Sequence, residues 1–153
     1  MQPPELEDSI EIAASPAAVW DLVGDPLRMP DWSPQVQSTR LRKGYDRVEV
    51  GTQFTNLNTL DELSWSTHGE VVRLAPQREL AFRIAENWVI WSFTLEPTAT
   101  GTRLTERRDA PEGISDLAAQ WTDEYVGGQE NFTKIMRAGV RQTLEAIKAA
   151  AEG

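Results

Sequence analysis

An amphipathic repeat dominates the C-terminal part of the chain, between Gln129 and Ala151. Apolar side chains recur there at the spacing of one helix face, and charged side chains fill most of the opposite face. The pattern predicts one long helix whose apolar face is buried by the preceding chain. Its apolar positions are Phe132, Ile135, Met136, Val140, Leu144 and Ile147.

The chain before this helix contains short segments in which polar and apolar residues alternate, the pattern of half-buried β-strands. In the segment 88–95 the alternation places Trp91 and Phe93 on one face. The segment 64–74 changes phase along its length, which predicts a β-bulge near Gly69. Strands are predicted at residues 9–13, 36–41, 53–60, 64–74, 79–84, 88–95 and 102–109.

Two short helices are predicted directly after the first strand. Ser15 followed by Pro16 is a specific helix start, because serine caps the first turn and proline suits the first helical position. This helix should run from Pro16 to about Val23 and end at Gly24. A second short helix or turn is predicted from Leu27 to Trp32.

A further helical stripe precedes the long helix and ends at two adjacent glycines. Because each glycine costs about 1 kcal/mol inside a helix, Gly127 and Gly128 predict a kink or a short loop. This point is either a hinge that opens the interior or simply the boundary between two helices. The stripe consists of Ile114, Leu117, Ala118, Trp121 and Tyr125.

Together these elements predict a single α+β domain over residues 1–153. We expect a curved antiparallel sheet of about seven strands that wraps around the C-terminal helix. Residues 1–5 contain two prolines and no apolar pattern, so this segment is expected to be disordered. A ligand site, if the protein has one, would lie in the interior between the sheet and the long helix.

Composition removes several classes of partner and cofactor. The formal net charge of −9 disfavours nucleic acid and anionic lipid surfaces, which bind clustered Lys and Arg. No apolar run is long enough to span a membrane and the start lacks the features of a signal peptide, so we expect a cytoplasmic protein. The absence of cysteine and the single histidine predict no disulfide, no metal centre and no cofactor of that kind.

Rings and apolar side chains on the predicted inner faces are the candidates for ligand contact. Trp32 could instead be a core residue that fills one end of the interior enclosed by the curved sheet. If Phe54 points inward, Asn56 and Asn58 share its face; the alternative turns Leu57 inward and leaves both amides in water. The candidate set is Trp32, Phe54, Asn56, Trp65, Phe82, Trp91, Phe93, Trp121, Tyr125, Met136 and Val140.

The order of one strand, two short helices, six strands and a long helix resembles the START-like superfamily that includes the birch-pollen allergen, which has a helix-grip fold. The run from Ile10 to Trp20, then Gly24-Asp25-Pro26 and Asp31-Trp32-Ser33-Pro34, is similar to the start of the bacterial polyketide cyclase/dehydrase and lipid-transport family. The resemblance implies an apolar or aromatic ligand between sheet and helix, and in some members its cyclisation, dehydration or hydrolysis. Catalytic members use different pocket residues, so it assigns no catalytic residue here.

Three functions remain open at this stage. The first is a binding module for an apolar or aromatic molecule. The second is a metal-independent enzyme of the cyclase or dehydratase type, for which His68, Glu106 and Arg108 are the candidate acid, base or polarising groups. The third is an interaction module with a filled core, in which Trp121 and Tyr125 would lie at a surface between partners. The protein could be a monomer or a homodimer.

Overall fold

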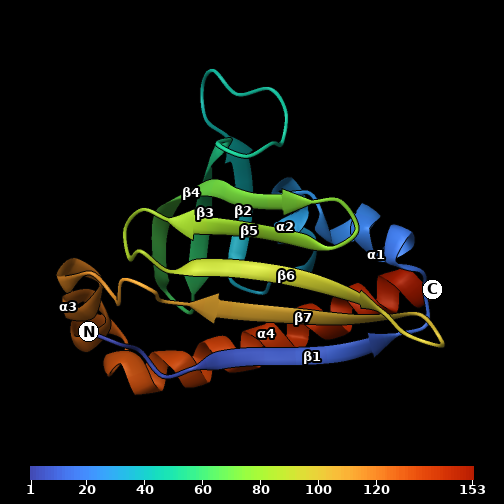
Figure 1. Cartoon of the computed structure of the whole chain (residues 1–153). Coiled ribbons are helices and arrows are strands. Elements are labelled where there is room, and N and C mark those ends of the chain that lie inside the picture. Colours follow the sequence, from blue (N-terminus) through green and yellow to red (C-terminus); the bar gives the residue numbers. More distant parts are fainter.

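A single antiparallel sheet of seven strands forms the frame of the protein, in the order β1-β7-β6-β5-β4-β3-β2. The computed structural model describes residues 1–153. The sheet curls so strongly that β2 and β3 run behind β4 and β5 (Figure 1). The elements along the chain are β1 (Leu6–Ile12), α1 (Pro16–Val23), η1 (Pro26–Arg28), α2 (Met29–Trp32), β2 (Val36–Leu41), β3 (Gln53–Leu60), β4 (Leu63–Ala75), β5 (Glu79–Ile84), β6 (Ile90–Pro97), β7 (Thr102–Asp109), α3 (Asp116–Tyr125) and α4 (Gly128–Glu152).

The long helix α4 lies across the concave side of the sheet, behind β7 and β1 (Figure 1). In its C-terminal half, Val140, Leu144 and Ile147 belong to one buried cluster together with apolar residues of β1, α1, β6 and β7. In its N-terminal half, Phe132 and Met136 are only partly buried, because they border an internal cavity. The expected helix-grip fold, with two short helices after the first strand, is confirmed.

Local signals placed the first helix accurately. The Ser15 hydroxyl accepts a hydrogen bond from the backbone N–H of Ala18 at 3.2 Å, and α1 begins at Pro16 as predicted. The helix ends at Gly24, where a Cβ atom would lie 2.5 Å from the Trp20 ring. Glycine is therefore needed at this position for close packing as well as for the end of the helix.

Three strands differ from their predicted extents. β1 begins three residues earlier than predicted, because Leu6 pairs with Arg108 on β7. β6 begins at Ile90, since Trp88 has a positive φ of 70° and belongs to the preceding turn. The irregularity in β4 falls between Val71 and Arg73, so the predicted bulge near Gly69 was misplaced by a few residues.

Residues 1–5, for which the sequence predicts disorder, make hydrogen bonds to distant parts of the chain in this structure. The Met1 carbonyl accepts a hydrogen bond from the Ile114 N–H at 2.6 Å, and Arg108 donates to the Pro4 carbonyl at 2.7 Å. Arg137 of α4 donates to the Glu5 carbonyl at 2.7 Å. These partners lie more than 100 residues away in the sequence, which is why local composition gives no sign of them.

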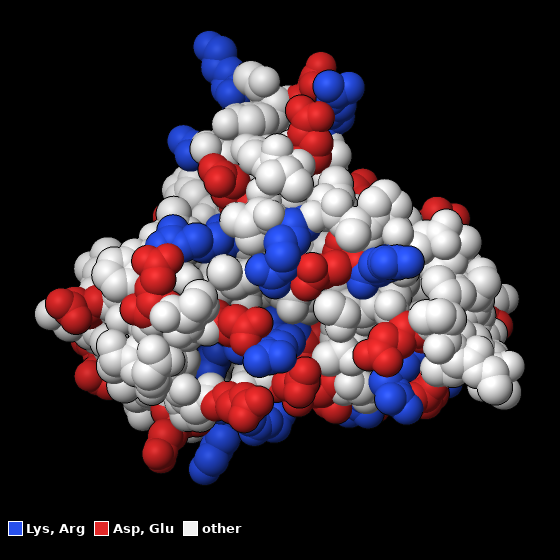
Figure 2. Space-filling view, in the orientation of Figure 1, with Lys and Arg blue, Asp and Glu red and all other residues white.

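Opposite charges are mixed on the outer face of the sheet (Figure 2). Arg103 pairs with Glu11 across β7 and β1 at 2.7 Å, and Arg107 pairs with Asp109 at 2.8 Å. Exposed pairs of this kind contribute little to stability, about 0 to 1 kcal/mol each. None of the helices has both the length and the apolar character needed to cross a membrane.

Candidate functional site

A cavity of about 350 Å³ lies between the concave side of the sheet and the helices α2, α3 and α4. Of its 28 lining residues, 14 are hydrophobic. Both clusters of buried apolar side chains contribute to the lining, the first through Val140 and the second through Phe82. Since one water molecule occupies about 30 Å³ in the liquid, this space exceeds a few waters and contradicts the alternative of a filled core.

Aromatic rings from three elements gather at one end of the cavity. The rings of Trp65 on β4 and Trp121 on α3 lie 4.9 Å apart between centroids. Phe132 of α4 meets Trp121 edge-on at 6.1 Å. Tyr125 continues the row at 5.8 Å from Trp121, but it is exposed and does not line the cavity.

Two amide side chains of β3 form a polar strip in the wall. Phe54 points inward, and the period of two carries Asn56 and Asn58 to the same buried face, as the first of the two alternatives predicted. The Asn56 carbonyl oxygen accepts a hydrogen bond from the Thr39 hydroxyl at 2.7 Å. The Asn58 amide donates to the Thr67 hydroxyl at 3.0 Å. These hydrogen bonds fix both side chains and satisfy part of their hydrogen-bonding capacity.

Glu106 is the acidic group of the interior. It points inward from β7, between Asp8 of β1 and Phe93 of β6, and is 9% exposed. Its Oε1 atom has no hydrogen-bond partner. Burial, and secondarily the charge of Asp8, raises the pKa of the Glu106 carboxyl to about 8. At neutral pH this side chain is therefore mostly a neutral acid that can donate a proton or a hydrogen bond.

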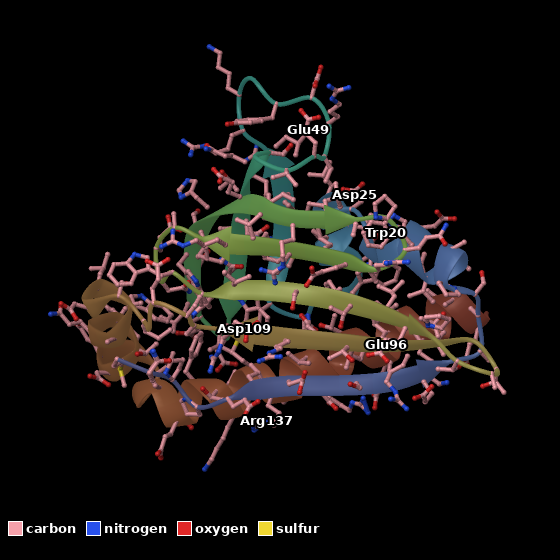
Figure 3. All side chains as sticks on the ribbon, in the orientation of Figure 1. Trp20, Asp25, Glu49, Glu96, Asp109 and Arg137 are labelled. Atoms are coloured by element: carbon pink, nitrogen blue, oxygen red, sulfur yellow. The ribbon has the colours of Figure 1, made fainter.

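Arg108 is two residues further along the same face of β7 and is 6% exposed. It donates to the Thr133 hydroxyl of α4 at 3.0 Å, in addition to the Pro4 carbonyl, while its Nε has no partner. Burial and the nearby charge of Arg137 lower the pKa of Arg108 to about 10, so it stays charged at neutral pH. Figure 3 shows Arg137 on α4 beside β1. No ion pair joins Arg108 to Glu106, although the two side chains share a face of β7.

Several predicted site residues border the cavity, and others do not. Trp32 instead packs on the core, donating its indole N–H to the Leu22 carbonyl at 3.3 Å. Phe54 and Phe93 are buried among other core side chains. These three residues and Tyr125 are therefore corrected as cavity-lining candidates. The predicted residues that do line the cavity are Asn56, Trp65, Phe82, Trp91, Trp121, Met136 and Val140, together with Glu106 and Arg108.

His68 does not face the cavity. It follows Trp65 by three positions on β4, and since successive strand residues alternate between faces, it lies on the opposite face. Its Nδ1 lies 2.6 Å from Glu86 Oε2, and both side chains are more than a third exposed. His68 is thus held at the surface by a carboxylate, and its candidacy as a catalytic residue is corrected.

The sequence reasoning missed polar side chains on the buried face of the helices. Thr133 holds Arg108, and Gln129 donates to the Thr122 hydroxyl of α3 at 2.8 Å. Thr143, also in the lining, donates to the Gly139 carbonyl. The helical spacing that links Phe132, Met136 and Val140 includes positions 129, 133 and 143 as well. The sequence signal for these residues is a polar side chain at a position that belongs to the apolar stripe of the helix.

Comparison with known proteins gives consistent results along the whole chain. The family model described as polyketide cyclase/dehydrase and lipid transport matches residues 3–152. A polyketide-cyclase-like protein from Corynebacterium glutamicum is 29% identical, with 99% of this chain and 94% of that chain covered and a TM-score of 0.62. A Chromobacterium violaceum protein is 18% identical, with 99% of each chain covered and a TM-score of 0.70.

One similar structure is that of a protein from a biosynthetic pathway. The di-domain ARO/CYC StfQ from the steffimycin biosynthetic pathway is 18% identical and has a TM-score of 0.75, with 97% of this chain and 50% of that chain covered. At this level of identity the likeness concerns the fold alone. No curated protein matches the chain in sequence.

Proposed function

The chain belongs to the polyketide cyclase/dehydrase and lipid-transport family, and we propose that it binds an apolar or aromatic small molecule, lipid-like or polyketide-like, in the cavity between the sheet and α4. The observation that carries the proposal is the unfilled cavity of about 350 Å³ with its largely apolar lining. This volume lies in the range of about 300 to 1,000 Å³ that is typical of small-molecule sites.

The lining suits such a ligand physically. The rings of Trp65, Trp91 and Trp121 offer flat apolar surfaces, and Met136 has a flexible side chain that adapts to different shapes. Burying apolar ligand surface gains roughly 25 cal/mol per Å², so a ring system that fills the cavity can bind without many polar contacts. Part of that gain offsets the cost of immobilising the ligand.

Binding is tested with a panel of fatty acids, sterols and polyaromatic compounds, measured by native mass spectrometry and by the fluorescence of the tryptophans that line the cavity. We expect at least one chemical class to bind in a 1:1 ratio. Met136→Trp replaces a flexible side chain of the lining with a bulkier indole ring, which should fill part of the cavity and abolish binding. Ala138→Trp adds the same ring on the exposed face of α4 and is the matched control. Absence of binding across the panel would remove the proposal's main support.

A cyclase or dehydratase activity is the second candidate, favoured by the buried Glu106 and Arg108 in the lining. A neutral carboxyl group can donate a hydrogen bond to a substrate carbonyl, and a guanidinium can stabilise the enolate oxygen that forms. Holding a flexible poly-ketone so that its reacting carbons meet can supply about 7 to 11 kcal/mol in favourable cases. Such an enzyme therefore needs few titratable groups.

The second candidate is tested with a synthetic poly-β-ketone thioester, by comparing the products formed with and without the protein. An enzyme should accelerate one cyclisation, and Glu106→Gln should reduce the rate while binding persists. A product distribution identical to that of the uncatalysed reaction would leave binding as the function.

A further inference from the structure

Two polar atoms in the interior lack hydrogen-bond partners although their side chains are more than nine-tenths buried. They are Oε1 of Glu106 and Nε of Arg108, and both residues line the cavity. Buried polar atoms are nearly always paired in folded proteins, so each unpaired one needs an explanation. A bound ligand that supplies the missing partner is one such explanation.

The two side chains are placed to act on one small group. They stand at positions i and i+2 of β7, so they share a face and their Cα atoms are roughly 6 to 7 Å apart. Two other buried polar side chains of the wall each have a hydrogen-bond partner: Asn56 accepts from Thr39, and Asn58 donates to Thr67. Glu106 and Arg108 are the lining residues that keep a buried polar atom without a partner.

The charges around this position favour an anion. Arg108 is cationic, and Arg137 of α4 adds a second positive charge near it. Asp8 of β1, which faces Glu106, is paired with Arg141 of α4 at 3.1 Å. Glu106 is protonated at neutral pH and adds no negative charge. Glu86, the other acid of the lining, accepts a hydrogen bond from the backbone N–H of His68 at 2.7 Å, and its second carboxylate oxygen lies 2.6 Å from His68 Nδ1.

We propose that the ligand carries one anionic oxygen group, a carboxylate or an enolate, which accepts hydrogen bonds from the Arg108 guanidinium and from the Glu106 carboxyl, while its apolar body lies against the aromatic lining. The inference rests on the proposed binding function and names the chemical class of the ligand. The charged end of the ligand then lies against β7, at Glu106 and Arg108.

The first test compares ligands that differ only in this group, by fluorescence titration at pH 7. The probes are anthracene-2-carboxylic acid and dodecanoic acid, each with its methyl ester. A charge-assisted hydrogen bond at a buried site should make the acids bind about 10-fold or more tightly than their esters. Arg108→Met should reduce that ratio to about one. Arg107→Met removes a charge from the exposed face of the same strand and should leave the ratio unchanged.

A second test covers the case in which Arg108→Met does not fold, because Arg108 also holds Pro4 and Thr133. Between pH 7 and 9 the acids remain ionised, whereas Glu106 becomes charged. Affinity for the acids should therefore fall over this range in the native protein, and affinity for the esters should not. In Glu106→Gln, whose amide N–H₂ still donates a hydrogen bond but does not titrate, the fall should disappear.

The outcomes separate this inference from the proposed function. If acids and esters bind equally, or esters bind better, the cavity binds apolar molecules and the anionic group is wrong. If the acids' affinity is as insensitive to pH as that of the esters, the role given to Glu106 is wrong. If neither acids nor esters bind, the proposed binding function fails and the inference fails with it.

Discussion

The ring of Phe54 on β3 lies over Gly69 on β4, so close that a Cβ atom on Gly69 would stand 2.3 Å from Phe54 Cζ. The two residues are direct partners in the β3–β4 ladder. Phe54 also meets the edge of Phe82 with ring centroids 5.3 Å apart. The glycine thus makes room for a fully buried ring, and the ring fills the core at a place where the sequence suggested a ligand contact.

Gly69→Ala should destabilise the protein, because the added methyl group overlaps a rigid ring held by core packing. Overpacking of this kind costs about 1 to 3 kcal/mol, measurable as a shift in the denaturant midpoint. A second change, Phe54→Leu, removes the ring and should make Gly69→Ala less costly in that background. Equal costs of the alanine in both backgrounds would show that the contact does not matter.

Stability should fall with rising pH through the contribution of Glu106. The pKa of this carboxyl is about 8 in the folded protein and returns to its ordinary value of 4.5 in the unfolded chain. Between these values the folded state binds more protons, so the contribution is complete below about pH 4.5 and is lost as the pH rises through about 8. The slope from one such group is about 1.4 kcal/mol per pH unit.

Glu106→Gln isolates this contribution. The free energy of unfolding of the variant, relative to that of the native protein, should rise steadily between pH 5 and 8 in urea titrations. Glu96→Gln, which removes a charge from an exposed position of β6, is the control and should show no such rise (Figure 3). A flat difference for Glu106→Gln would mean that its pKa is not raised.

Removing the histidine should have little effect. His68 lies outside the cavity and its contact with Glu86 is more than a third exposed on both sides, so His68→Gln should cost less than about 1 kcal/mol. Any ligand affinity or catalytic rate found for the native protein should persist in the variant, because His68 itself does not line the cavity. A rate that falls with the imidazole would restore His68 as a catalytic candidate.

The two glycines at the junction of α3 and α4 should tolerate asparagine better than alanine. Gly127 and Gly128 have φ of 76° and 91°, in the left-handed region that side chains with a Cβ avoid. Gly127→Ala should therefore cost about 1 to 2 kcal/mol, and Gly127→Asn less, because asparagine visits this region more readily. Thermal denaturation of the two variants measures the difference. Equal losses of stability in the two variants would mean that the cost comes from crowding against the nearby Asn131 side chain and not from the backbone conformation.

The sequence alone determined the secondary structure where the deciding interactions are local. The Ser15 cap and the Gly24 end fixed α1 to the residue, because each acts within one turn of helix. Alternation along β7 placed Glu106 and Arg108 on the inner face, since the period of two holds wherever a strand is regular. With the resemblance to a known family, these patterns were enough to identify the helix-grip fold.

Only the tertiary structure decided which inward residues border the cavity and which fill the core. Trp91 and Phe93 share a face of β6, yet only Trp91 lines the cavity, because α4 and the curvature of the sheet close the space over Phe93. The contacts of Met1 with Ile114 and of Pro4 with Arg108 join positions more than 100 residues apart in the chain. Periodicity reports the face on which a side chain lies. The depth of the space beyond that face depends on how distant elements pack together.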